Sequence, residues 1–395
     1  MPKRGKKEGS IFQRKDGRWV GSLNLGWEDG KRKRRHFYAA TAAEVRDELL
    51  KARSDQSRGL PVAAERQTVA NFLEGWLEHT LKARAKPRSI ESFTAIVNKH
   101  IVPALGRIRL DKLTPQQVQA LLEKKRQPYK TKDKTGKVVE KHGLGPQSIA
   151  NIRTVLRSAL GQALKWGMVA RNVATLIDAP RIPRPQTHAI DADGARKLLQ
   201  TARGERFEAI LVLALTLGLR RGEILGLRWL DVDFEEGALR VSQAVQRIGG
   251  KLQVTDVKTE RSRRVVAIPE SVVRALKTRR AQQAQERLLA GSEWKDSALA
   301  FTNPTGGPLE PITLHRDYKR MLTAAGLPTK VRFHDLRHTA ASLLLAEGVH
   351  LRVIMELLGH SSISLTANTY AHVMPAAMRD VADKMENIFA NREVH

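Results

Sequence analysis

The last quarter of the chain gathers side chains that suit the handling of a phosphodiester. His334 and Arg337 stand three residues apart in a segment that its alanines and leucines predict to be helical, so both side chains would share one face. A guanidinium fork matches phosphate oxygens in pairs, and an imidazole donates a hydrogen bond or takes a proton. His360 follows after a glycine turn, and Tyr370 comes next. Among phosphate-binding cations, a tyrosine is suited to act as a nucleophile toward phosphorus.

Two earlier stretches add to this set. Arg220 directly follows an apolar segment, residues 207–219, which predicts that it stands at the end of a buried helix. Glu223 lies one helical turn further on, where it would orient Arg220 or a neighbouring histidine. Lys258 belongs to a basic stretch, residues 256–264, which we predict to form a hairpin turn.

Each of these residues also has a plain structural interpretation. Arg220 could be a surface arginine, but its position against the end of a buried helix favours a function. Arg228 is interpreted as a residue of a helix surface or one that contacts the DNA backbone. Lys258 is harder to single out, because three arginines lie in the same stretch. His338 falls one turn further along the predicted helix, and we interpret it as structural. The alternative tyrosines, Tyr129 and Tyr318, lie away from any phosphate-binding cluster.

The composition points to a polyanionic partner. The chain has 395 residues, with 69 Lys and Arg against 41 Asp and Glu, a formal net charge of +28 and a pI of about 10.6. Nucleic acid is the simplest partner for so positive a protein. A ribosomal or purely structural basic protein is usually shorter and less apolar than the 41% found here. The absence of cysteine excludes disulfides, thiol nucleophiles and cysteine metal sites.

Nothing in the sequence predicts export or a membrane span. The start lacks the apolar core of a signal peptide, and the longest apolar run, residues 210–219, is far too short to cross a bilayer. We therefore expect a cytoplasmic protein.

Two polar linkers rich in proline and glycine, residues 53–66 and 178–187, predict three domains. These are a small α+β unit at 1–60, an all-α unit at 67–178 and a mixed α/β unit at 187–395. The fold class is therefore predicted as mainly α with small β-sheets.

The N-terminal unit shows three short strand patterns separated by turn residues, and then a helix opened by Thr41 and Glu44 as a capping box. The third strand begins with a basic run. A solvated charged edge would be unremarkable, but beside two further basic strands a sheet that enters a DNA groove is the better interpretation. The predicted DNA-binding residues of this run are Lys31, Arg32, Lys33, Arg34 and Arg35.

The middle unit carries clear helix starts, at Thr68 and at Thr114 with Pro115 and Gln117. A lysine-rich stretch between its last two predicted helices is expected to be a loop or short hairpin that faces phosphate. Its predicted DNA-binding residues are Lys130, Lys132 and Lys134.

In the last unit, helices are interrupted by a β region. We predict one three-stranded sheet from residues 239–241, 253–255 and 264–268, with a turn at Gly249 and Gly250.

Taken in chain order, the candidate residues strongly resemble the tyrosine recombinase family, to which the phage integrases belong. The stretches that carry the resemblance are TLGLRRGE at 216–223, KTERSRR at 258–264, HDLRH at 334–338, LGH at 358–360 and TYAH at 369–372. Each is weak alone, whereas all five in order are highly specific. For residues 1–180 the resemblance rests on layout, which is that of a three-domain integrase. It implies an arm-type DNA-binding domain, a SAM-like core-binding domain and a catalytic domain.

The resemblance implies roles at the scissile phosphate. Arg220 and Arg337 would clamp its non-bridging oxygens and stabilise the five-coordinate transition state. His360 would donate a hydrogen bond to a phosphate oxygen.

It also implies how protons move. Tyr370 would attack phosphorus, His334 would assist the transfer of the phenolic proton, and Lys258 would protonate the departing 5′-oxygen. The products would be a 3′-phosphotyrosine and a free 5′-hydroxyl. Religation would need no ATP, and neither a metal nor another cofactor would be required.

By the same resemblance, the protein is expected to integrate a phage or mobile element at attachment sites and, with a helper factor, to excise it. Its partners would be double-stranded DNA with core and arm-type sites and three further copies of itself in a tetramer. A host DNA-bending protein and an excisionase are open as additional partners.

Three other functions are weighed against this one. A zinc hydrolase would use His334 and His338, but aspartate stands where such a helix needs glutamate, and Arg337 would repel a dication. A non-catalytic DNA-binding regulator explains the charge but not the ordered site. A type IB topoisomerase would share the chemistry without site preference, and the N-terminal basic sheet argues against it.

Overall fold

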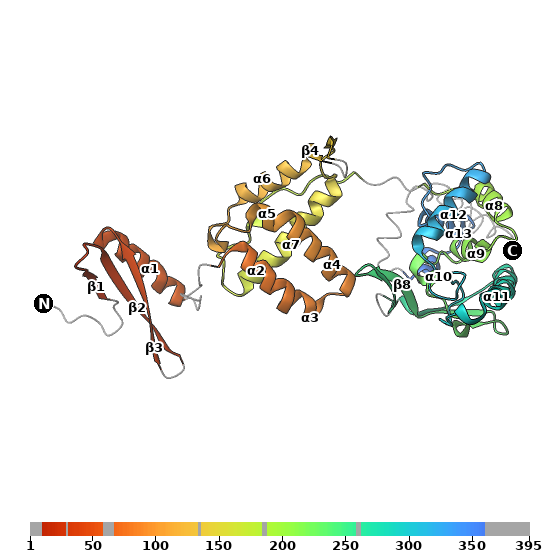
Figure 1. Ribbon diagram of the computed structural model, residues 1–395, viewed down its shortest axis with the longest axis horizontal. Helices are drawn as coiled ribbons and strands as arrows, with labels where there is room; N and C mark the ends of the chain where they lie inside the picture. Colours follow the sequence, from red (N-terminus) through yellow and green to blue (C-terminus); the bar gives the residue numbers. More distant parts are fainter. Residues whose placement is uncertain are drawn as a thin grey trace, which may run out of the picture. The chain divides into compact units, whose positions relative to one another are not determined.

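The computed structural model describes residues 10–28, 31–57, 67–132, 136–183, 188–257 and 262–359. They belong to two units, Met1–Arg184 and Pro185–His395 (Figure 1). Helices dominate the described residues, and the strands form only small sheets. This confirms the predicted fold class, mainly α with small β-sheets.

The first unit begins with a three-stranded antiparallel sheet covered by one helix. Its elements are β1 (Ser10–Gln13), β2 (Trp19–Glu28), β3 (Lys31–Ala39) and α1 (Ala42–Ser57), with the strands in the order β1-β2-β3. Gly21 lies where α1 packs on β2, since a Cβ there would stand 2.5 Å from Val45 Cγ1. The predicted capping box is present: Thr41 Oγ1 accepts from the Glu44 amide, and the Glu44 carboxylate accepts from the Thr41 amide.

Helices build the rest of the first unit. They are α2 (Val69–Gly75), η1 (Trp76–Leu81), α3 (Lys82–Arg84), α4 (Pro87–Ile96), η2 (Val97–Ile101), α5 (Val102–Leu105), η3 (Leu110–Lys112), α6 (Pro115–Arg126), α7 (Pro146–Lys165) and η4 (Val173–Thr175). Thr68 caps α2, and Thr114 with Gln117 forms a complete capping box at α6, as predicted. The inward side of α7 packs with α6 around an apolar core that includes Val118 and Leu156.

A short hairpin joins α6 to α7. Its strands, β4 (Tyr129–Lys132) and β5 (Val138–Lys141), pair antiparallel. Of the two forms that the sequence allowed, a loop or a hairpin, the hairpin is the one that forms.

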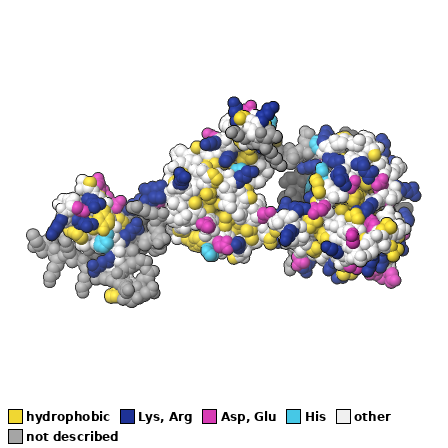
Figure 2. Space-filling model, viewed as in Figure 1, with side chains coloured by type: hydrophobic (Ala, Val, Ile, Leu, Met, Phe, Trp, Pro, Cys, Tyr) yellow, Lys and Arg dark blue, Asp and Glu magenta, His cyan; other side chains and the backbone are white. Residues whose placement is uncertain are grey.

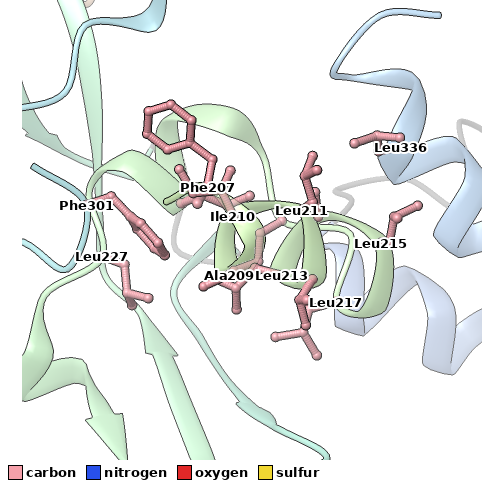
Figure 3. Close-up of a cluster of buried hydrophobic side chains, with 14 of the residues drawn as sticks. Phe207, Ala209, Ile210, Leu211, Leu213, Leu215, Leu217, Leu227, Phe301 and Leu336 are labelled. Atoms are coloured by element: carbon pink, nitrogen blue, oxygen red, sulfur yellow. The ribbon is translucent and has the colours of Figure 1, made fainter. Parts of the chain in front are cut away.

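The second unit is built around the buried helix α9 (Glu208–Thr216). This helix is apolar on all sides, so it must be covered on all sides, and every residue from 209 to 215 is buried. Figure 3 shows Phe301 and Leu227 at one end of it and Leu336 of α13 at the other. The other elements are α8 (Ala192–Thr201), α10 (Arg221–Leu225), η5 (Trp229–Asp231), β6 (Val232–Asp233), β7 (Ala238–Val241), β8 (Gln243–Ile248), β9 (Lys251–Asp256), β10 (Arg264–Ala267), α11 (Glu270–Ala290), η7 (Gly291–Glu293), α12 (Pro311–Ala324), α13 (Asp335–Ala346) and α14 (Leu351–Leu358).

The predicted three-stranded sheet of this unit is wrong in one strand. The sheet has the order β10-β7-β6, so its third strand is the two-residue β6 and not residues 253–255. Those residues belong to β9, which pairs with β8 in a separate hairpin. Gly249 and Gly250 both have positive φ, and this tight turn returns the chain onto its immediate neighbour. The β8–β9 hairpin therefore contains residues 253–255, which we predicted as a strand of the three-stranded sheet.

Within the described residues, no helix is both long enough and apolar enough to cross a membrane.

Candidate active site

Arg220 stands directly before α10, where the chain leaves the buried helix α9. Gly218 makes the turn with a φ of 60°, and a Cβ there would lie 2.4 Å from Leu358 Cδ2, so the turn packs closely on α14. Arg220 Nη1 donates to Glu223 Oε1 at 2.7 Å, and Nη2 donates to the Gly359 carbonyl at 3.1 Å. Both ends of the guanidinium are thus held, while 37% of the side chain remains exposed.

Glu223 is a buried carboxylate that two guanidinium groups share. Its Oε1 accepts from Arg220, and its Oε2 accepts from the Arg220 amide and from Arg264 Nη2, each at 3.1 Å. Burial alone would raise the pKa of Glu223, but the positive charges of Arg264 and Arg220 outweigh it and hold the pKa below its usual value. The carboxylate therefore stays ionised and orients Arg220, as the sequence predicted for one of its two options.

Arg337 is the most deeply buried of the described candidate cations. It lies in the first turn of α13, and the residue is only 2% exposed. Its Nη1 donates to the Gly218 carbonyl at 2.7 Å, and its Nη2 donates to the Leu358 carbonyl at 2.6 Å. One guanidinium therefore joins three segments: the turn after α9, helix α13 and the end of α14.

His334 directly precedes the first residue of α13 and contacts His338, with their ring centroids 5.2 Å apart in an edge-to-face arrangement. The residue as a whole is exposed, yet the protein atoms around its imidazole lower its pKa to about 4, and the charges of His338 and Arg337 act in the same direction. The imidazole is therefore neutral at pH 7 and able to accept a proton.

In an NMR pH titration, we expect the ring resonance of His334 to keep the chemical shift of a neutral imidazole between about pH 8 and about pH 5.5. The resonance is identified by its loss in His334→Gln. An unfolded histidine titrates near pH 6.5, so between that value and about 4 the unfolded chain binds more protons than the folded protein. This residue should therefore lower the stability as the pH falls through that window. A titration midpoint near the unperturbed value in the NMR spectrum would contradict the expectation.

The end of α14 is where these side chains meet. Arg220 and Arg337 both donate to carbonyls of its last residues, and Glu223 fixes Arg220 from the other side. Gly359, which ends the helix in the left-handed conformation, directly precedes His360 in the sequence. Three of the six predicted catalytic residues lie outside the described part of the chain: Lys258, His360 and Tyr370.

Two arginines were not placed correctly by sequence reasoning. Arg264 was only a basic neighbour of Lys258, but its side chain is 8% exposed and bound to Glu223. A signal was present, since Arg264 lies two residues before the buried Val266 on β10, and residues two apart share one face of a strand. Arg228 was predicted on a helix surface or against DNA. It lies before the short helix η5, and its guanidinium makes two hydrogen bonds to the Asp231 carboxylate.

The basic run of β3 divides between the two faces of the N-terminal sheet. Arg35 shares the face covered by α1, where its guanidinium lies 5.1 Å from the centre of the Phe37 ring. Arg34 alternates with it and lies on the open face. Tyr38 lies on that same face and is 52% exposed. The backbone of residues 31–33 continues β3, but their side chains lie outside what the structure describes.

The β4–β5 hairpin presents the second predicted DNA-binding group. Lys130 is exposed on β4, and Figure 2 shows lysine and arginine side chains gathered at this hairpin. The backbone of Lys132 belongs to β4, but its side chain is not described, and Lys134 lies outside the described residues.

The described residues contain no group of three or more His, Asp or Glu side chains that could hold a metal ion. The zinc alternative requires His334 and His338, whose ring centroids lie 5.2 Å apart.

Comparison with known proteins places the chain in a family. The family model described as "Phage integrase family" matches residues 188–376, and "Phage integrase, N-terminal SAM-like domain" matches residues 68–126. An integrase of Saccharopolyspora erythraea is 28% identical, covering 96% of each chain. A XerC-like tyrosine recombinase of Caldanaerobacter subterraneus is 29% identical, covering 92% of this chain and 94% of its own.

Solved structures show the same fold. The Tn1549 transposon integrase in complex with transposon right end DNA matches with a TM-score of 0.62 at 19% identity, over 80% of this chain and 100% of that one. A lambda integrase tetramer bound to a Holliday junction matches with a TM-score of 0.54 at 18% identity, over 93% and 96%.

Proposed function

The chain belongs to the phage integrase family of site-specific DNA recombinases, and we propose that it cleaves and rejoins DNA through a 3′-phosphotyrosine at Tyr370. The observation that carries the proposal is the convergence of Arg220 and Arg337 on the last residues of α14. That end leads directly into His360 and, ten residues later, Tyr370. The two arginines are thus held beside the segment that precedes His360 and Tyr370 in the sequence.

The two guanidinium groups are suited to a phosphate whose charge grows during the reaction. Phosphoryl transfer through a five-coordinate state concentrates negative charge on the non-bridging oxygens, and donors that are already oriented stabilise it without reorganisation. Glu223 and the Gly359 carbonyl orient Arg220, and the carbonyls of Gly218 and Leu358 orient Arg337. Their charge is the reason that the reaction needs no metal ion.

Proton transfer completes the proposed mechanism. A phenol with a pKa near 10 is mostly protonated at pH 7, so attack by Tyr370 needs a proton acceptor. His334 is proposed for this role because its imidazole is neutral at pH 7 and so has an unprotonated nitrogen that can accept a proton. Lys258 supplies a proton to the departing 5′-oxygen, and His360 donates to a phosphate oxygen. In the second half-reaction a 5′-hydroxyl attacks the phosphotyrosine, and the new phosphodiester retains the energy of the old one.

The N-terminal sheet is proposed to bind arm-type DNA through its open face. That face carries the cation Arg34 and the exposed rings of Tyr38 and Phe12, whereas the opposite face is covered by α1. Lys31, Arg32 and Lys33 would extend the contact along the backbone of the DNA. A charged face with exposed rings is typical of β-sheets that enter a DNA groove.

The assembly is proposed to be a homotetramer on DNA, by extension from the lambda integrase tetramer on a Holliday junction. The DNA would carry core sites and arm-type sites, and the β4–β5 hairpin would contact its phosphates. A host DNA-bending protein and an excisionase would set the direction. The proposed reaction is the integration of a phage or mobile element into a chromosomal attachment site.

The test is covalent trapping in excess EDTA. Nicked duplexes from the DNA that flanks the gene are incubated with the protein, the reaction is stopped with SDS, and the digested adduct is mapped by mass spectrometry. A nucleotide on Tyr370 is expected. Cleavage that appears only after metal is added would replace the proposal with a hydrolase, and cleavage of every duplex alike would indicate a topoisomerase.

A further inference from the structure

Three arginines donate to the carboxyl end of α14. The last carbonyls of a helix lack partners within it and carry the negative end of the helix dipole, so cations there are favourable. Each of the final three carbonyls has its own arginine: Arg264 Nε donates to Leu357 at 2.7 Å, Arg337 Nη2 to Leu358 at 2.6 Å and Arg220 Nη2 to Gly359 at 3.1 Å. Two of the three belong to the proposed phosphate clamp. The third, Arg264, has no part in the mechanism proposed above.

The side chain of Arg264 is bound entirely within the protein. It is 8% exposed, and besides the Leu357 carbonyl it donates to the Ser262 carbonyl and to Glu223 Oε2, both at 3.1 Å. Its neighbour differs sharply, because the Arg263 side chain is 61% exposed and pairs with the exposed Asp256. Arg264 is therefore not available to a DNA phosphate at the surface, and it shares one partner, Glu223, with Arg220.

Glu223 makes the link between Arg264 and Arg220. With both cations present, the buried carboxylate divides its two oxygens between their side chains. Without Arg264, Oε2 would lose its guanidinium partner, and the carboxylate would favour a two-pronged contact with Arg220. That contact would draw the Arg220 guanidinium toward Glu223 and away from the Gly359 carbonyl.

We propose that Arg264 is a positioning residue, which holds Glu223 and the end of α14 so that the Arg220 guanidinium keeps the orientation needed for the scissile phosphate. It acts through Arg220 and does not contact DNA. The inference rests on the proposed function of Arg220 in the phosphate clamp.

The test compares Arg264→Met with Arg263→Met, which removes an equal charge from the adjacent, exposed position. Single-turnover cleavage of a nicked duplex is measured at saturating protein: the amplitude counts competent sites, and the rate reports on their geometry. We expect Arg264→Met to slow cleavage about 10- to 100-fold, as loss of an orienting partner typically does. Its amplitude and DNA affinity should be unchanged, and Arg263→Met should cleave at the wild-type rate.

Two further variants separate positioning from simple structural support. Arg264→Lys restores the ion pair to Glu223 but cannot make the hydrogen bonds to both the Leu357 and the Ser262 carbonyls. Its cleavage rate should therefore fall between those of the wild type and Arg264→Met. This comparison remains informative even if Arg264→Met folds poorly. In an Arg220→Lys background, Arg264→Met should add little further loss, because both changes act on the same group.

The possible outcomes test the positioning role of Arg264 separately from the proposed cleavage through Tyr370. A wild-type protein that forms no adduct would overturn both. An active wild type would overturn the inference alone in any of three cases: Arg264→Met cleaves normally, it loses amplitude or affinity but not rate, or its loss multiplies fully with that of Arg220→Lys.

Discussion

Replacing Tyr370 by phenylalanine is expected to abolish the covalent adduct and to lower strand cleavage by about 10⁴-fold or more, the size of loss seen when a covalent enzyme is deprived of its nucleophile. The change removes one oxygen atom and nothing else, so no atom remains that can attack phosphorus. DNA affinity should be close to that of the wild type, because a phenol hydroxyl contributes little to a contact dominated by phosphate charge. Trapping with SDS measures the first quantity, and a mobility-shift titration at fixed salt measures the second.

The remaining tyrosines provide controls. Tyr318 is 0% exposed on α12, and burial raises its pKa, so it is neither accessible nor easily ionised. Tyr129 on the β4–β5 hairpin and Tyr38 on the N-terminal sheet are each 52% exposed, and Tyr129 is the accessible alternative nucleophile considered from the sequence. Tyr129→Phe should therefore form the adduct at the normal rate. An adduct that persists in Tyr370→Phe, or one that is lost in Tyr129→Phe, would show that the nucleophile is a residue other than Tyr370.

Elements with local signals could be predicted from the sequence. Thr114 and Gln117 satisfy each other's backbone groups within four residues, so the start of α6 needs no distant partner to be recognised. The same holds for Thr41 and for Thr68, whose hydroxyl oxygens accept from amides three residues on. Helix α9 was equally clear, because an apolar stretch with no polar side has to be buried.

Long-range pairing could not be predicted in the same way. Residues 253–255 have a strand pattern, but the pattern does not say whether β8 or β7 will be the partner. Arg264 shows the same limit in the site. Its place on the same strand face as the buried Val266 indicates an inward side chain, but its partners Glu223 and Leu357 are 41 and 93 residues away in the sequence. From the sequence alone this stretch is a basic cluster, and only the folded structure shows that Arg264 is buried and Arg263 is exposed.

Replacing either arginine of the proposed clamp is expected to slow cleavage by about 10²- to 10³-fold, the usual effect of removing one preorganised donor from a charged transition state. The two variants should differ in stability. Arg337→Ala leaves the carbonyls of Gly218 and Leu358 without their buried donors, at about 1–3 kcal/mol for each unsatisfied group. Arg220→Ala removes a side chain that is 37% exposed, and the buried Glu223 carboxylate keeps Arg264 as a partner, so its cost in unfolding free energy should be smaller.

Chemical denaturation gives the stability difference, and a modified substrate isolates the electrostatic part of the rate. In a duplex whose scissile phosphate carries a methyl group in place of one non-bridging oxygen, the phosphate is neutral and needs less positive charge. The defect of Arg220→Ala should therefore shrink on this substrate, because the charge that Arg220 neutralises is gone. A defect of equal size on both substrates would mean that Arg220 supports the fold of the site and does not bind the phosphate. Because we propose both roles for Arg337, its variant should recover rate on the neutral substrate and yet remain less stable, and this combination separates the two proposed functions in one protein.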